Sequence, residues 1–155
     1  MRSADQARRP DGPSGIEKTS AAALPAAPVA IPGVVAGQPL IWLRIEALAV
    51  AGAALAVFAH TGHSWWLIPA LFLVPDLSWF GYLAGPRAGA WIYNLAHSGP
   101  LPLVLLAAGA GWHVSALTVA GAVGLFHLGV DRVLKYGLKY DHSFAITHLG
   151  VHGKH

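Results

Sequence analysis

Four long apolar runs restrict this chain to a helical fold embedded in a membrane. They cover residues 40–59, 65–84, 88–112 and 114–134. At about 1.5 Å per helical residue, the first run is about 30 Å long, which matches the hydrocarbon core of a bilayer. Only 11% of the residues are charged, whereas an ordinary soluble domain has about 25%. We therefore expect an all-α fold, a four-helix transmembrane bundle whose partner is the lipid bilayer.

Prolines interrupt two of these runs. Pro75 lies inside the second run and removes the intrahelical hydrogen-bond partner of the Leu71 carbonyl. Pro100 and Pro102 act in the same way on the third run, and each disfavours helix in the residue before it. Broken helices at membrane depth are tolerated where they line protein or a cavity. We therefore expect the third helix to be broken just after His97.

The two ends of the chain differ in composition from the apolar middle. Residues 1–37 are rich in Ala, Pro, Gly and Ser and show no apolar period, which predicts a disordered cytoplasmic tail. No apolar segment follows the arginines of this tail as a signal peptide would require. Residues 38–136 form the expected four-span membrane domain. The polar segment 137–155 is expected on the cytoplasmic side, either as a solvated tail or folded back onto the mouth of the bundle.

Basic residues predict how the spans are oriented. In a four-span model all ten Lys and Arg residues fall on one side, in the tail or at Arg44, Arg87, Arg132, Lys135, Lys139 and Lys154. The opposite loops, 60–63 and 111–113, contain neither Lys nor Arg. The positive-inside rule then places both termini in the cytoplasm. A net charge of +3 is too small and too scattered to indicate a nucleic-acid partner.

Ionisable residues inside the apolar runs mark one depth in the membrane. Asp76 lies about 14 Å and His97 about 15 Å from the cytoplasmic ends of their helices, given the helical rise. His127 is at a similar level in the fourth run, and Asp131 lies four residues later on the same helix face. Charged groups at such depth are costly and persist where they pair, face water or carry out a function. The sequence therefore predicts a polar layer in the cytoplasmic half of the bundle.

Three interpretations of this layer stay open. Its residues can join helices through hydrogen bonds in a structural or partner-binding subunit. They can relay protons or ions in a small transporter. They can also bind a divalent metal (Zn, Mn or Fe) in a membrane enzyme that acts on a small-molecule or lipid substrate. The chain has no cysteine and so no thiolate ligand.

The metal hypothesis assigns a role to eight residues. Those expected to be both catalytic and metal-binding are Asp76, His97, His127 and Asp131. Those expected to surround and support them are Arg87, Tyr93, Asn94 and His148.

Three segments carry a family resemblance. PDLSWFGYLAGPRAGAWIYNLAH, HLGVDRVLKYGLKY and the closing THLG resemble the domain of unknown function 4260 family of small bacterial membrane proteins. The resemblance covers about residues 40–150 and implies a four-span membrane domain without a particular activity. The residues that match the motif positions of the family are Asp76, Gly81, Tyr82, Gly85, Arg87, Tyr93, Asn94, His97, His127, Asp131, Arg132, Gly137, Tyr140, Thr147 and His148.

Overall fold

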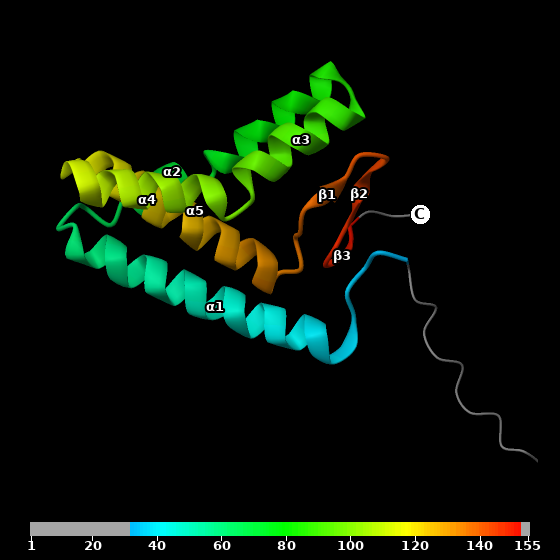
Figure 1. Ribbon diagram of the computed structural model, residues 1–155, viewed down its shortest axis with the longest axis horizontal. Coiled ribbons are helices and arrows are strands. Elements are labelled where there is room, and N and C mark those ends of the chain that lie inside the picture. Colours follow the sequence, from blue (N-terminus) through cyan, green and yellow to red (C-terminus); the bar gives the residue numbers. More distant parts are fainter. Residues whose placement is uncertain (1–31, 153–155) are drawn as a thin grey trace, which may run out of the picture.

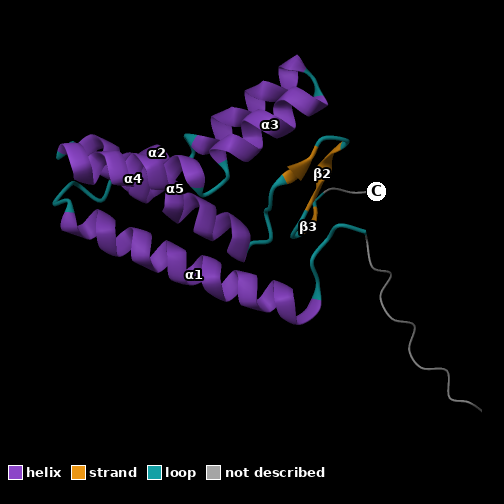
Figure 2. Ribbon diagram, in the orientation of Figure 1, coloured by secondary structure: helices purple, strands orange, loops and turns teal. Residues whose placement is uncertain are grey.

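The computed structural model describes residues 32–152 and is mostly helical (Figures 1 and 2). The helices are α1 (Gly37–His60), α2 (Leu67–Phe72), the 3₁₀ helix η1 (Pro75–Ala84), α3 (Pro86–Ala96), α4 (Pro100–Trp112) and α5 (Ser115–Val133). The strands are β1 (Lys139–Tyr140), β2 (Ser143–Thr147) and β3 (Gly150–Val151). The expected tail, residues 1–37, lies mostly outside the described residues.

Three helical segments of the described chain are long and apolar enough to cross a membrane. They are Gly37–His60, Leu67–Ala84 and Ser115–Val133. The third expected span, residues 88–112, is instead divided between α3 and α4. The mostly helical character of the fold is thus confirmed, whereas the four-span bundle stays a prediction.

Helix α5 packs against both α1 and α4, and we call these three helices the apolar layer (Figure 1). Glycines permit these close contacts. A Cβ added at Gly129 would lie 2.7 Å from the carbonyl oxygen of Ala47 in α1, and one at Gly121 would lie 2.7 Å from that of Pro102 in α4. Small residues at helix interfaces let the backbones approach in this way. Phe58 of α1 is buried in the same core.

The third apolar run is broken where the prolines predict it. Helix α3 ends at Ala96, His97 has φ −103° and ψ 21°, and α4 begins at Pro100. The second run is irregular as well, because α2 ends at Phe72 and a 3₁₀ helix starts at Pro75. Helix α3 packs against η1, and this pair leans away from α1 in Figure 1. Both breaks therefore lie at the point where the pair leaves the apolar layer.

The 3₁₀ geometry of η1 determines which of its residues share a face. With about three residues per turn, side chains at i and i+3 are aligned. Asp76, Trp79 and Tyr82 therefore lie in one row. The rings of Trp79 and Tyr82 meet Phe144 of β2 edge-on, at centroid distances of 5.9 and 5.0 Å. The row that starts with Asp76 thus faces the C-terminal sheet.

The expectation of an all-α fold is wrong for the C-terminal segment, which forms a three-stranded antiparallel sheet in the order β1-β2-β3. The sheet docks on α3. The Asn94 amide donates to the carbonyl of Lys139 (2.9 Å), and the Lys139 N–H donates to the Asn94 carbonyl oxygen (2.8 Å). Val35, just before α1, donates its N–H to the carbonyl of His148 (2.8 Å). Of the two alternatives for this segment, the described part folds back onto the helices.

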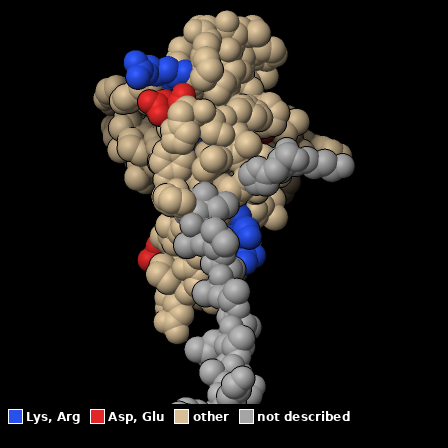
Figure 3. Space-filling view, turned by 90° about the vertical axis from the view of Figure 1, so that its right-hand side faces the viewer, with Lys and Arg blue, Asp and Glu red and all other residues tan. Residues whose placement is uncertain are grey.

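The start of α1 and the end of α5 lie together on the side of the molecule that carries the sheet (Figure 1). Arg44 Nε donates to the carbonyl of Val133 over 2.8 Å and joins these two ends. Figure 3 views this side and shows few charged side chains among a surface of other residues. The turns at the opposite ends of the helices contain no Lys or Arg.

Candidate metal centre

Three separate segments contribute the residues of the polar cluster, which we define as Asp76, His97, His127 and Asp131. Asp76 lies in the first turn of η1, and His97 is the residue that ends α3. The other two lie one turn apart on α5. The two helix breaks therefore bring Asp76 and His97 to the same place on α5.

Each histidine of the cluster contacts both carboxylates. His97 Nε2 lies 3.3 Å from Asp76 Oδ1 and 3.7 Å from Asp131 Oδ2. His127 Nε2 lies 3.8 Å from the same Asp76 oxygen and 3.4 Å from the same Asp131 oxygen. The expected convergence of these four side chains is thus present, whereas their catalytic and metal-binding roles stay predictions.

The ring of His97 is fixed in one orientation. Its Nδ1–H donates to the carbonyl of Tyr93, 3.1 Å away and one helical turn earlier. The Tyr93 ring stacks on the imidazole with a centroid distance of 3.7 Å and an interplanar angle of 11°. Because Nδ1 carries the proton, the neutral ring directs the lone pair of Nε2 toward the two carboxylates. A backbone partner on the far nitrogen is the usual arrangement of a metal-binding histidine.

His127 is more deeply buried and less well satisfied. It is 1% exposed, and neither ring nitrogen has a well-oriented hydrogen bond within the described part of the chain. The rings of Phe72 and His97 pack against it at centroid distances of 4.7 and 5.1 Å. A buried polar nitrogen without a partner is uncommon, because its desolvation is then uncompensated. Such an atom indicates that something else binds there.

The electrostatics of the cluster require a positive charge. Two carboxylates and the lone pair of His97 Nε2 converge within 3.7 Å, and the Asp131 side chain is only 16% exposed. Partly buried anions repel each other and the lone pair unless a cation lies among them. The nearby ammonium of Lys139 lies 4.9 Å from the centre of the Tyr93 ring. It donates a hydrogen bond to the Phe144 carbonyl rather than to a carboxylate of the cluster. A metal ion or added protons can supply the missing charge.

The spacing of the ligand atoms suits one metal ion. Atoms about 2.1 Å from a common metal in a tetrahedral arrangement are about 3.4 Å apart. The four histidine–carboxylate distances in the cluster run from 3.3 to 3.8 Å. In addition, the ligand atoms of Asp76, His97 and His127 all lie within 4.8 Å of one another. A small contraction around a cation would bring these atoms to bonding distance.

The four residues expected around the cluster behave differently from one another. Tyr93 contacts His97 through its ring and its carbonyl. Asn94 binds the backbone of β1 instead. The structure does not bring Arg87 to the cluster, because it lies at the far end of α3, where its Nε is 3.9 Å from Asp141. His148 accepts the N–H of Leu138 on its Nδ1 and belongs to the sheet.

Two residues near the cluster were not expected from the sequence. Phe72, at the end of α2, packs against the ring of His127. The sequence feature that could have indicated this contact is an aromatic residue just before the break at Pro75. Lys139 lies over the Tyr93 ring, although the sequence indicated only a cytoplasmic charge. Burial lowers the pKa of Lys139, and the carboxylate of Asp131 opposes part of that change. Its ammonium therefore interacts with Asp131 at long range, without an ion pair to the cluster among the described residues.

The chain belongs to the family described as domain of unknown function (DUF4260), whose model matches residues 40–151. That range contains the cluster, both helix breaks and the C-terminal sheet. None of the curated proteins and none of the solved structures match this chain.

Proposed function

We propose that this protein is a membrane enzyme that uses one divalent metal ion, held by Asp76, His97 and His127. The observation that carries the proposal is the orientation of His97, whose Nδ1–H is bound to the Tyr93 carbonyl. Its Nε2 must therefore meet the two carboxylates with a lone pair, and a metal ion makes that contact favourable. The unsatisfied nitrogens of His127 support the same assignment.

A set of two histidines and one carboxylate favours catalysis over a purely structural metal. Catalytic zinc sites have three protein ligands and leave a further position for water or substrate, and iron(II) enzymes use a similar triad. Asp76 is 33% exposed, so the cluster is open on its side. A metal ion held here would supply a Lewis acid that makes a water molecule more acidic. Asp131, 3.4 Å from His127, would serve as the general base.

The membrane setting extends the proposal. We place the chain in a bacterial inner membrane with four passes, in which α3 and α4 together make the third, and with both termini in the cytoplasm. The support is the position of the basic residues at one end and their absence from the opposite turns. Reporter fusions after His155 and in the turn at His60–His63 should give opposite locations. Equal locations would remove the four-pass arrangement and the assignment of the cluster to the cytoplasmic half.

A proton relay is the second candidate function. The observation that favours it is the alternation of carboxylates and imidazoles in the cluster. Each carboxylate lies within 3.8 Å of both histidines, so a proton can pass from one to the next without a gap. Chains of Asp and His serve this purpose in transporters. A relay needs protons in the place that the metal would occupy. The presence of a bound metal therefore decides between the two candidates.

Metal analysis of the purified full-length protein tests the enzyme proposal. Samples in detergent are incubated in turn with zinc, manganese and anaerobic iron(II), freed of excess ions and measured by mass spectrometry. We expect about one ion per chain for one of these metals, because three ligand groups, those of Asp76, His97 and His127, converge on one point. Asp76→Asn should lose it, whereas Asp141→Asn, an exposed carboxylate next to Arg87, should not. Absence of all three metals, together with pH-driven proton flux in liposomes, would overturn the enzyme in favour of the relay.

A further inference from the structure

An apolar pocket lies between α2, η1, α4 and α5. It has a volume of about 350 Å³, within the range of about 300 to 1,000 Å³ that is typical of ligand pockets. Its walls come from two of the membrane-type segments, Leu67–Ala84 and Ser115–Val133, from α4 and from the last residue of α3. Ser78 is the single polar side chain among its lining residues.

This pocket adjoins the polar cluster at each of its three segments. Pro75 and Ala96 line it and directly precede Asp76 and His97 in the chain. Val123 also lines it and lies one helical turn before His127 on α5. The helix breaks that assemble the cluster therefore also form one end of the pocket.

Water molecules would lack hydrogen-bond partners in this pocket. A buried water needs two to four polar partners, and the lining offers one hydroxyl side chain. The Oγ of Ser78 is buried and has no hydrogen-bond partner within residues 32–152. The room arises from small residues, Ala96, Ala120 and Gly124, inside segments that we place in the membrane. An occupant must then be mostly hydrocarbon and must carry an oxygen that can accept the Ser78 hydroxyl.

We propose that the pocket holds an acyl chain of a lipid substrate whose polar group reaches the metal cluster. The proposal rests on the metal-dependent function above and names its substrate class. The acyl chain lies against Leu101, Leu105 and Val123, and the lipid oxygen nearest to this chain accepts a hydrogen bond from Ser78. Asp76 directly follows Pro75 of the pocket wall and contacts His97, so a lipid whose chain fills the pocket can bring its polar group to the cluster.

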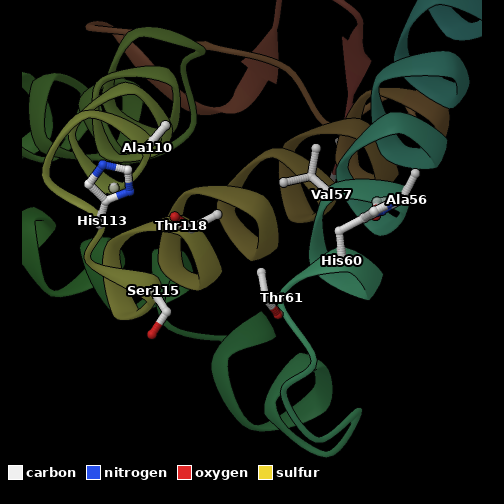
Figure 4. Close-up of a pocket in the computed structure, with 9 residues that line it drawn as sticks. Ala56, Val57, His60, Thr61, Ala110, His113, Ser115 and Thr118 are labelled. Carbon is white, nitrogen blue, oxygen red and sulfur yellow. The ribbon is translucent and has the colours of Figure 1, made fainter.

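A second pocket, of about 520 Å³, has a different character and is not part of this site. It lies at the opposite ends of α1 and α5, where His60 and His113 stand on either side of it (Figure 4). Thr118, which also lines it, is nine residues before His127, or about 14 Å along α5. The ring of His60 already contacts the carbonyl of Ala56 at 2.7 Å. Of these two pockets, the first thus adjoins the cluster and the second does not.

Photolabelling in lipid nanodiscs tests the lipid site. The probe is phosphatidylglycerol with a diazirine in the middle of one acyl chain, and a second arm uses the corresponding free fatty acid. We expect labels on Leu101, Leu105 and Val123 above the level at Leu103, which is 55% exposed on α4 outside the pocket. Labelling by the phospholipid alone would identify a membrane lipid as the ligand of the pocket, and labelling by the fatty acid alone would identify a released acyl chain as the ligand.

Two alanines of α5 provide a matched pair of variants. Ala120→Phe fills the pocket, whereas Ala116→Phe adds the same ring one turn earlier, outside the pocket lining. Ala120→Phe should reduce pocket labelling by about fivefold or more, as expected for steric overfilling. Ala116→Phe should leave it unchanged. Both variants should retain the metal content of the unchanged protein, which verifies that they fold.

The outcomes separate the two proposals. Bound metal with labelling no higher in the pocket than at Leu103 would overturn the lipid site and leave the metal enzyme standing. Labelling that Ala120→Phe abolishes, without any bound metal, would overturn the metal enzyme and leave a lipid site. Equal loss of labelling in Ala116→Phe and Ala120→Phe would also overturn the pocket as the site of binding.

Discussion

Helix α5 and the broken second and third runs supply the same chemistry in different ways. Helix α5 is continuous over 19 residues and presents His127 and Asp131 on one face through their i, i+4 spacing. The broken runs present Asp76 and His97 only because the chain changes direction at Pro75 and before Pro100. A regular helix thus provides a pair at fixed spacing, whereas an irregular one brings distant residues to that pair.

The difference also determines what each region can tolerate. Close glycine contacts fix α5 against α1 and α4, so its polar pair has little freedom. His97 sits in the break and depends on its own hydrogen bond and on the Tyr93 ring. If both α5 and the broken runs are needed to bind the metal, a substitution in either region should weaken metal binding by a similar factor. If the pair on α5 binds the metal without the broken runs, a substitution in the broken runs should weaken metal binding less.

The largest expected effect comes from removing one histidine from each half. His97→Ala and His127→Ala should each weaken metal binding by more than about a hundredfold, because losing a ligand exceeds the cost of losing a supporting residue. Titration in detergent with whichever of zinc, manganese and iron(II) the purified protein binds measures both affinities. His142→Ala, at an exposed position in the sheet segment, is the control. A loss confined to His127→Ala would show that the α5 pair binds the ion without the broken runs.

A smaller effect should follow from repairing the break. Pro100→Ala restores a backbone N–H where α4 begins and lets α3 continue toward it. His97 would then shift from its place, and metal affinity should fall by about tenfold, since ligands must be held within about 0.5 Å. Pro86→Ala changes the proline that starts α3, at the end remote from His97, and should leave the affinity unchanged. Equal affinity in Pro100→Ala would show that the proline does not position His97.

The sequence predicts the apolar segments and the depth of the polar residues because both depend on position along the chain. Helical rise places Asp76 and His97 at one level, and their convergence with the α5 pair agrees with that estimate. The break after His97 also follows locally, from two prolines. These features need no knowledge of which segments are neighbours.

Other features depend on contacts between distant segments and could not be predicted. The strands of the C-terminal sheet have two to five residues, too few for a clear alternation of apolar and polar side chains. Asn94 was assigned to the cluster from its depth, but its rotation around α3 directs it to the backbone of Lys139. Arg87 shares the family motif with His97 yet lies about 15 Å away, at the other end of the same helix.

The docking of the sheet tests whether the broken half needs support from outside the membrane segments. Asn94→Ala removes both hydrogen bonds to Lys139 and should lower the free energy of unfolding by about 1 to 3 kcal/mol. Faster hydrogen exchange of the Lys139 amide should accompany it. Ser98→Ala, which loses one exposed bond to the Leu95 carbonyl, should change little. Metal binding as strong as in the unchanged protein would show that the sheet does not position His97.

The smallest expected effect concerns the ring that stacks on His97. Tyr93→Leu keeps an apolar, helix-compatible side chain and the carbonyl that accepts the Nδ1–H, but it removes the stacked ring. Such aromatic pairs contribute about 0.5 to 1.5 kcal/mol beyond their buried area, so metal affinity should fall about twofold to tenfold. Tyr93→Phe retains the stacking and should bind the metal like the unchanged protein. A similar loss in Tyr93→Phe would assign the effect to the hydroxyl, and no loss in Tyr93→Leu would mean that the backbone hydrogen bond alone orients His97.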